Sequence, residues 1–167
     1  GDVASLSRSL RAPASRRASR DVKAMGGKVD PKDTWWLKST SSNDNMIDVN
    51  GTEEFLQALK EAGDRLVIVD FYARWCGACR GLFPKLCKIA SQEENKDILF
   101  VKVEFDDNKE MCRSMGVKIL PFFHFYKGKE GKVEEFSASI SKIKLLREKI
   151  EKHHPAPVGD KEAEPVA

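Results

Sequence analysis

Two cysteines separated by two residues are the feature of this sequence most able to do chemistry. They lie in the segment Trp75-Cys76-Gly77-Ala78-Cys79-Arg80, between a buried-strand pattern and a helical pattern. At a helix start, the unpaired amides and the helix dipole stabilise a thiolate, so we expect Cys76 to ionise below the ordinary thiol pKa of about 8.5 and to act as nucleophile. Cys79 lies one helical turn further on, on the same face, where it can resolve a mixed disulfide formed by Cys76.

A carboxylic acid lies inside the apolar run that precedes the cysteines. Asp70 is the one charged residue of Leu66-Val67-Ile68-Val69-Asp70-Phe71-Tyr72, and burying a carboxylate in such a strand is costly. Burial raises the pKa of this carboxyl, which allows it to accept the Cys79 proton, through water, as Cys79 attacks. We therefore expect Asp70 to be a buried general base; an accidental acid on an edge strand is the alternative.

The elements that must position these groups follow from the periodicity of the apolar residues. Strand patterns cover 46–49, 66–72, 98–105 and 122–126, with a hairpin partner around Val133 and Phe136, and helical patterns follow Asn50 and cover 76–91, 109–115 and 143–150. The order is βαβαβαββα. Crossover and hairpin rules then predict an α/β fold with a central mixed sheet and helices on both faces.

Local signals refine this scheme. Asn50, with Glu53 three residues later, predicts a capped helix in which Phe55, Leu56 and Leu59 share the buried face. Pro84 predicts a kink in the helix that carries the cysteines.

Length and charge set the broad class of the protein. The 167 residues weigh 18.8 kDa and are 41% hydrophobic, which suits one domain with tails. The apolar runs all fall well short of the roughly 18 residues of a membrane span. Residues 1–30 hold seven Lys and Arg against three Asp, so the remaining 22 basic and 23 acidic residues nearly balance. This balance argues against nucleic-acid binding by the folded part.

The two ends differ in composition from the middle of the chain. Ser and Arg alternate between Val3 and Arg20 without an acidic residue, which is typical of an organelle transit peptide, with an ordinary basic tail as the alternative. We expect a disordered basic segment and linker over 1–34, one domain over 35–154 and a disordered tail over 155–167. Trp35 and Trp36 should pack on the domain, because adjacent indoles seldom stay exposed.

Four landmarks at matching positions resemble the thioredoxin family, and the resemblance covers residues 46–152. Besides the cysteine pair, Asp70 lies six residues before Cys76, Pro84 lies five after Cys79, and Pro121 follows Ile119-Leu120. A CxxC motif alone is weak, because it also occurs in zinc sites, but the combination is specific. The resemblance implies a thioredoxin fold and a thiol-disulfide oxidoreductase that acts on protein disulfides and dithiols and needs no metal or organic cofactor.

The resemblance also implies which residues contact the substrate. Trp75, Gly77 and Ala78 surround the cysteines, and Leu120 and Pro121 lie where the family has its cis-proline. We expect a cis bond before Pro121 and a strand edge that offers the Leu120 backbone to an extended substrate segment. An ordinary edge-strand proline is the alternative.

A narrower resemblance points to the atypical Cys/His-rich thioredoxins of plant chloroplasts. It rests on Trp35-Trp36, Leu86-Cys87-Lys88-Ile89, Met111-Cys112-Arg113-Ser114 and Leu120-Pro121-Phe122-Phe123-His124-Phe125-Tyr126. It implies a monomeric chloroplast protein of redox signalling. Its expected partners, bound through transient mixed disulfides, are 2-Cys peroxiredoxin and thiol-regulated plastid enzymes.

Two residues depart from the family pattern. Ala78 replaces a proline, and we expect its amide to donate to the Cys76 thiolate and so raise the reduction potential. Ala138 replaces a glycine that follows Phe136-Ser137, which should add a methyl group where partner backbones approach and narrow the partner range.

Several residues have two interpretations. Cys87 and Cys112 are buried packing residues or regulatory thiols. His124 is a plain strand residue or a ligand, and His153-His154 are a solvated helix end. For the cysteine pair itself, half of a zinc site is the alternative chemistry. For the whole chain, the alternative is a noncatalytic thioredoxin-fold module that only holds a partner.

Overall fold

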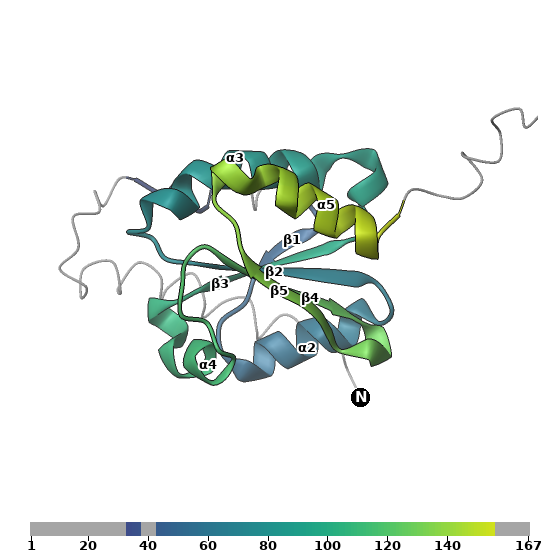
Figure 1. Ribbon diagram of the computed structural model, residues 1–167. Helices are drawn as coiled ribbons and strands as arrows, with labels where there is room; N and C mark the ends of the chain where they lie inside the picture. Colours follow the sequence, from purple (N-terminus) through teal and green to yellow (C-terminus); the bar gives the residue numbers. More distant parts are fainter. Residues whose placement is uncertain (1–32, 38–42, 156–167) are drawn as a thin grey trace, which may run out of the picture.

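The computed structural model describes residues 33–37 and 43–155, and the elements follow one another in the predicted order (Figure 1). In chain order the strands and α-helices are β1 (Met46–Asp48), α2 (Thr52–Ala62), β2 (Leu66–Tyr72), α3 (Gly77–Ser91), β3 (Leu99–Glu104), α4 (Lys109–Ser114), β4 (Phe122–Lys127), β5 (Lys132–Ser137) and α5 (Ile143–His153). Expectations for 1–32 and 156–167, including the basic segment and the C-terminal tail, lie outside the described residues.

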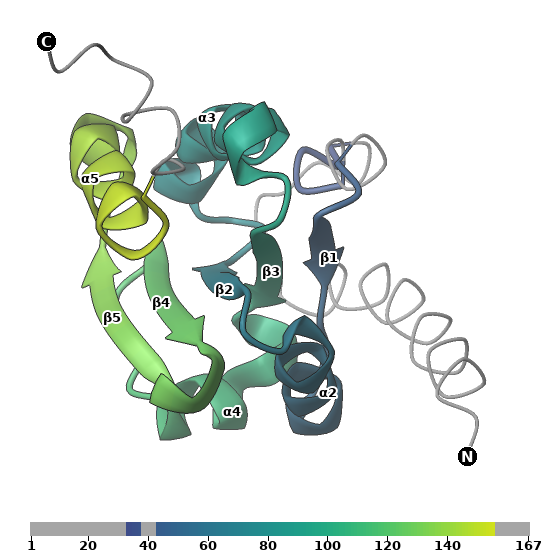
Figure 2. The same ribbon diagram turned by 90° about the vertical axis from the view of Figure 1, so that its right-hand side faces the viewer.

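The strands form one mixed sheet in the order β1-β3-β2-β4-β5. The first three strands are parallel, whereas β4 runs antiparallel to β2 and β5 antiparallel to β4. Helices α3 and α5 cover one face, and α2 and α4 cover the other (Figures 1 and 2). The predicted mixed sheet with helices on both faces is therefore confirmed.

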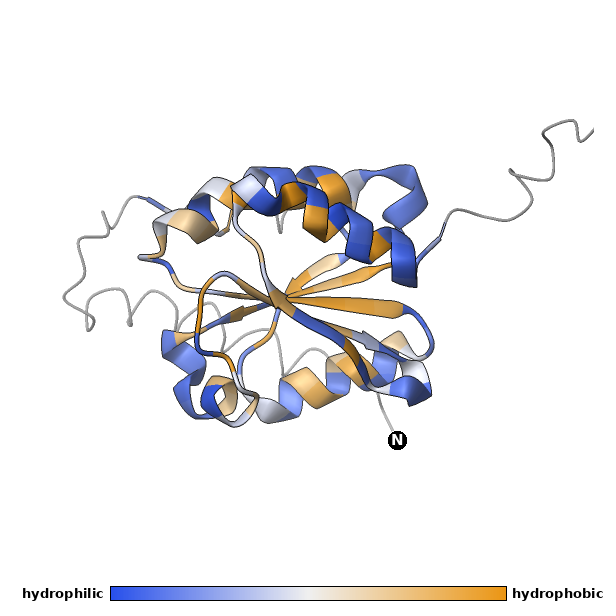
Figure 3. Cartoon of the chain, in the orientation of Figure 1, coloured by the Kyte–Doolittle hydropathy of each residue, from blue (hydrophilic) through white to orange (hydrophobic). Residues whose placement is uncertain are grey.

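The central strand β2 is buried along its whole length, which explains its continuous apolar sequence. Alternate residues supply two cores: Ile68 and Tyr72 pack on the α3–α5 side, and Val69 and Phe71 on the α2–α4 side. The central strands are accordingly mostly hydrophobic, whereas the helices and β5 mix hydrophobic and hydrophilic residues (Figure 3). Each large side chain buried in this way contributes roughly 1.5–3 kcal/mol.

Helix α2 differs from the prediction in its cap and its buried face. The helix begins one residue later than expected, with Gly51 as N-cap at φ 90°, and no side chain caps it. Asn50 N–H donates instead to the carboxylate of Glu54, at 3.0 Å, and Gly51 N–H donates to Asn108 Oδ1 at 2.7 Å. The expected Asn50–Glu53 cap is therefore wrong, because the positive φ suits the glycine at the turn.

The side chain of Leu56 lies outside the core. Leu56 is 57% exposed, while the face that packs on the sheet consists of Phe55, Ala58 and Ala62, with Leu59 at its margin. The prediction for Phe55 is thus confirmed and the prediction for Leu56 is wrong. In the described part of the chain, every helix is too short or too polar to cross a membrane.

Candidate active site

The cysteine pair lies at the N-terminus of α3, as predicted. Cys76 is the N-cap residue, with extended backbone angles, and its Sγ accepts a hydrogen bond from Cys79 N–H at 3.2 Å. The two cysteines form a disulfide, with Cα atoms 5.2 Å apart. Both are largely buried, at 7% and 4% exposure, while Trp75, Gly77 and Ala78 beside them are exposed. The pair is therefore placed for reversible disulfide chemistry at an accessible surface.

The amide that reaches Cys76 Sγ in this disulfide form belongs to Cys79 and not to Ala78. An N-cap side chain accepts from the second or third amide of the helix, and here the third amide, that of Cys79, is in reach. The expected Ala78 hydrogen bond concerns the Cys76 thiolate of the reduced protein and stays a prediction.

The segment before β4 lies at the same end of the sheet as the cysteines. Phe122 at the start of β4 pairs with Phe71 near the end of β2, and the chain reaches Cys76 a few residues after β2 ends. The Leu120–Pro121 bond is cis, as expected. The Pro121 carbonyl accepts from Ser137 Oγ at 2.8 Å, and Leu120 is half-buried against the core.

Two apolar residues near this surface differ from what the sequence predicted. Ile119 is 60% exposed directly before Leu120 and was not among the expected substrate-binding residues, although an apolar residue adjoining the Leu-Pro motif could have indicated it. Ala138 is 1% exposed and belongs to the core on the α3–α5 side. Its methyl group is therefore directed into the core and does not obstruct an approaching backbone.

Asp70 is buried on the face of β2 that α3 covers. It lies two residues from Ile68 and two from Tyr72 and therefore shares their face of the strand. Ile68 and Tyr72 belong to the same core as the two cysteines, and Asp70 is 6% exposed. Desolvation raises the pKa of Asp70 to about 7; the Lys102 cation opposes this rise and the Asp48 carboxylate adds to it. The expected burial is confirmed. A carboxyl with this pKa can both hold and release a proton near neutral pH.

These features agree with the comparison with known proteins. Residues 46–152 match the family model "Thioredoxin". The chain belongs to the thioredoxin family. It is 36% identical over 108 residues to a thioredoxin of Ictalurus punctatus, covering 65% of this chain and 98% of the fish protein. It is 50% identical over 144 residues to "Thioredoxin-like 2, chloroplastic" of Oryza sativa subsp. japonica, covering 86% of this chain and 64% of the rice protein.

The structural comparison gives the same family. The crystal structure of Chlamydomonas reinhardtii thioredoxin f2 superposes with a TM-score of 0.60 at 33% identity, over 67% of this chain and 99% of that one. The thioredoxin fold predicted from the sequence is thus confirmed. This chain spans 64% of the length of the rice relative.

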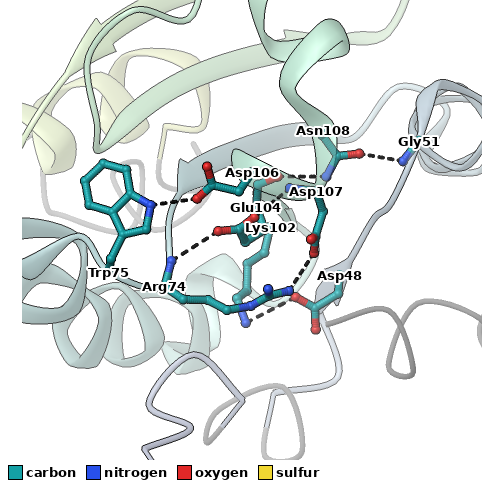
Figure 4. Close-up of polar contacts among 9 residues, drawn as sticks. All are labelled: Asp48, Gly51, Arg74, Trp75, Lys102, Glu104, Asp106, Asp107 and Asn108. Carbon is teal, nitrogen blue, oxygen red and sulfur yellow. Dashed lines mark hydrogen bonds and ion pairs between the residues drawn. The ribbon is translucent and has the colours of Figure 1, made fainter. Parts of the chain in front are cut away.

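Acidic side chains at the end of β3 hold the turn that leads into the thioredoxin dithiol (Figure 4). Trp75 Nε1 donates to Asp106 Oδ2 at 2.6 Å, and Arg74 N–H donates to Glu104 Oε2 at 3.2 Å. The buried Arg74 guanidinium pairs with Asp107 at 2.5 Å. These acids were not predicted from the sequence. The acidic segment Glu104-Phe105-Asp106-Asp107 at the end of a buried strand could have indicated them.

The other cysteines of the thioredoxin domain lie apart from the dithiol. Cys112 is fully buried on the α2–α4 side, and burial raises the pKa of its thiol to about 12, which favours the packing interpretation. Cys87 on α3 is half-buried and borders a surface pocket with Pro84 and Lys85. Within residues 33–37 and 43–155, no three His, Cys, Asp or Glu side chains are grouped to hold a metal ion.

The histidines occupy defined positions. His124 lies on strand β4, as the interpretation as a plain strand residue expected, and it is buried. The expected solvated helix end is wrong for the terminal pair, because His153 Nε2 lies 2.8 Å from Glu134 and His154 Nε2 lies 3.1 Å from Asp97. These pairs join the end of α5 to β5 and to the loop before β3.

Proposed function

We propose that this chain is a thiol-disulfide oxidoreductase that acts on protein disulfides and dithiols. The observation that carries the proposal is the Cys76–Cys79 disulfide at the start of α3, at the sheet end where the backbone before Pro121 is available. A helix start favours the thiolate of Cys76, which is the species that attacks a disulfide.

In the reductive direction, the Cys76 thiolate attacks one sulfur of a substrate disulfide. A Cys76–substrate disulfide forms, and the other substrate sulfur leaves as a thiolate that takes up a proton. Cys79, after losing its proton, then attacks Cys76 Sγ, which releases the second substrate sulfur and forms the Cys76–Cys79 disulfide. Two electrons pass from the dithiol to the substrate, and the oxidative direction is the reverse.

Asp70 has the role of general base for the second step. Its raised pKa matches the proton affinity needed to accept the Cys79 proton near neutral pH, and it lies on the β2 face that α3 covers. A water molecule relays the proton from the thiol to the carboxyl.

Five residues contact the substrate in this proposal. Trp75, Gly77 and Ala78 are exposed around Cys76, and Leu120 and Pro121 supply a strand edge on which an extended segment can pair. The Trp75 indole is held by Asp106, so it presents a fixed apolar surface.

The finer proposal concerns place and partners. The relative "Thioredoxin-like 2, chloroplastic" and the Ser/Arg composition of the N-terminal residues support a chloroplast protein in which residues 1–30 are an address and linker. The partners are 2-Cys peroxiredoxin and thiol-regulated plastid enzymes in redox signalling. A Cys79→Ser variant used as bait in a chloroplast stroma extract should retain 2-Cys peroxiredoxin in a disulfide that dithiothreitol releases. Its absence from the trapped fraction would contradict this partner.

Insulin reduction with dithiothreitol as donor tests the activity. The wild-type chain should accelerate precipitation of the insulin B chain. Cys76→Ser should abolish the acceleration, and Cys79→Ser should accumulate a mixed disulfide with substrate. A wild-type chain without turnover would support the noncatalytic interaction module instead, and trapping by Cys76→Ser alone would reverse the two roles.

A further inference from the structure

A short segment ahead of β1 contacts the redox site at three points. We call Asp33–Leu37 the strap. The Asp33 carboxylate forms an ion pair with Arg80, the residue after Cys79, and Trp35 Nε1 donates to the carbonyl of Arg74 at 3.1 Å. The Trp36 carbonyl accepts a hydrogen bond from Lys102 Nζ. Since Arg74 and Arg80 flank the dithiol, the strap is attached to both sides of it.

The two indoles fix the strap on the domain. Trp35 and Trp36 are 7% and 4% exposed and belong to the core on the α3–α5 side, as the sequence analysis expected. The Trp35 ring contacts Tyr72 and Phe83 with centroids 5.8 and 5.5 Å apart. The backbone of the strap is thereby held in one position above the end of the sheet.

Lys102 connects the strap to Asp70. It is the cross-strand partner of Asp70 in the parallel β2–β3 ladder, so the two side chains start from neighbouring positions on one face of the sheet. Lys102 is 1% exposed, and a buried ammonium needs acceptors. It finds them in the Trp36 carbonyl and in Asp48 Oδ1, at 3.3 Å, the latter pair being drawn in Figure 4.

The ammonium is therefore occupied by acceptors other than Asp70. It also lies over the Phe83 ring, 4.7 Å from the centroid, which adds a cation–π contact. Within the described part of the chain, no hydrogen bond or ion pair joins Lys102 to Asp70, and Asp70 Oδ1 is buried without a hydrogen-bond partner. The acid thus lies next to a cation that other groups hold.

We propose that the strap is a positioning element of the redox site: the Trp36 carbonyl, together with Asp48, holds the Lys102 ammonium away from Asp70, so that in the oxidised protein this acid keeps its proton to a higher pH than it would beside a free ammonium. The proposal rests on the proposed function in that Asp70 serves Cys79. It adds that residues 33–37, outside the sheet and its covering helices, set the protonation state of the acid.

Among the charged groups around Asp70, Lys102 is the cation that can favour ionisation of this carboxyl. Asp48, at the end of β1, disfavours a second negative charge at Asp70. Arg74 is paired with Asp107 and stacked 5.5 Å from the Trp36 ring centroid. Glu104 on β3 and Tyr72 on β2 are the remaining titratable groups of this face, and burial raises the pKa of both, which keeps Tyr72 neutral. Releasing Lys102 is therefore the change that would ionise Asp70.

Leu37→Pro tests the proposal with a matched control. Leu37 N–H donates to the Thr34 carbonyl at 2.9 Å and closes the turn that presents the Trp36 carbonyl. Proline removes this N–H and disfavours helical backbone angles at the preceding residue, Trp36. Leu37→Ala keeps the N–H, and since Leu37 is 44% exposed neither change empties the core. Trp36→Gly, which removes the indole that anchors the carbonyl, is the second variant.

The readout is the titration of the Asp70 carboxyl, followed by carbon-13 NMR on the full chain in the oxidised form. Leu37→Pro and Trp36→Gly should lower the midpoint by about one pH unit, and Leu37→Ala should leave it unchanged. In a Lys102→Met background Leu37→Pro should no longer lower it. Insulin reduction measured on the same samples reports the proposed function separately.

Two results would overturn the proposal. One is an unchanged Asp70 midpoint in a variant whose indole fluorescence is newly quenched by acrylamide, which shows that the strap has moved. The other is an equal fall of the midpoint with and without Lys102, because the strap would then act on Asp70 by another route.

Discussion

Each face of the sheet buries a group that can titrate near neutral pH, Asp70 on β2 and His124 on β4, and the surroundings of the two groups differ. Asp70 on β2 faces α3 and the dithiol, whereas His124 on β4 faces the α2–α4 core among aromatic rings, 4.9 Å from the Phe71 centroid. Desolvation drives both toward neutrality, raising the pKa of Asp70 to about 7 and lowering the pKa of His124 to about 4. Burial alone therefore does not identify a functional acid or base.

What separates the two groups is their neighbours. Asp70 shares its face with the cysteine pair and has a charged partner, Lys102, that the strap holds. His124 Nδ1 lies 3.1 Å from the Tyr126 hydroxyl, and its charged neighbour Glu135 is 3.8 Å away at the surface. In the proposed function the α3–α5 face takes part in proton and electron exchange, whereas the α2–α4 face serves packing alone.

The largest expected contrast is between cysteines on the two faces. Cys76→Ser should lower insulin reduction to the rate of dithiothreitol alone, because the attacking thiolate is lost. Cys112→Ala should change the rate less than twofold and lower the free energy of unfolding by about 1 kcal/mol, because it removes only a buried sulfur. A Cys112→Ala protein that folds but loses most of its turnover would place redox chemistry on the packing face.

Asp70→Asn should slow the resolution of the mixed disulfide by about 10- to 100-fold while leaving the first attack by Cys76 nearly unchanged. Rapid mixing with a fluorescent disulfide substrate separates the two steps. Equal slowing of both steps would show that Asp70 does not act specifically on Cys79.

The same substitution should stabilise the protein above neutral pH. The pKa of Asp70 is raised from 3.8 to about 7 by folding, so its carboxyl lowers the free energy of unfolding as the pH rises through this range. Asp70→Asn should therefore gain roughly 2–4 kcal/mol at pH 8 and little at pH 4 in urea unfolding. A gain that is the same at both pH values would contradict the buried, neutral acid.

His124 should have the opposite pH dependence. Folding lowers the pKa of His124 from 6.5 to about 4, so the stability that comes from its neutral form is present above pH 6.5 and is lost as the pH falls toward 4. His124→Phe should reduce the loss of unfolding free energy between pH 7 and pH 4 by roughly 1–3 kcal/mol. Insulin reduction at pH 7 by this variant should stay within twofold of the wild type, and a larger change would give His124 a part in the chemistry.

The smallest expected effect concerns the exposed apolar residues. Ile119 is 60% exposed next to Leu120, and Leu56 is 57% exposed on α2. Ile119→Ala should raise the KM for a protein substrate about two- to fivefold, because contact with the partner would bury this side chain. Leu56→Ala is the matched control and should leave the KM unchanged. Equal effects of the two variants would remove Ile119 from the substrate surface.

Periodicity and spacing were sufficient to predict the fold and the core of the site. The continuous apolar run of β2, the helix start at Cys76 and the acid at Asp70 are local patterns, so each could be recognised without a structure. The cap of α2 was predicted wrongly at Asn50, because a shift of one residue decides which group caps the helix.

Contacts between distant segments could not be predicted. The hydrogen bond from Lys102 to the Trp36 carbonyl joins residues 66 positions apart. The sequence shows two adjacent indoles that should pack, but not which backbone group they bring to the redox site. Likewise, Ala138 follows directly after β5, and its methyl group is buried because the chain there packs against the core on the α3–α5 side.

One titration tests the contrast between the two faces most directly. Carbon-13 NMR of the oxidised full-length chain, labelled at Asp and His, can follow Asp70 and His124 in one sample. We predict an Asp70 midpoint near pH 7 and a His124 midpoint near pH 4. An Asp70 midpoint near 4, the ordinary value of an aspartate, would mean that the carboxylate binds a proton too weakly to take one from Cys79 near neutral pH, and would contradict its role as the proton acceptor for Cys79.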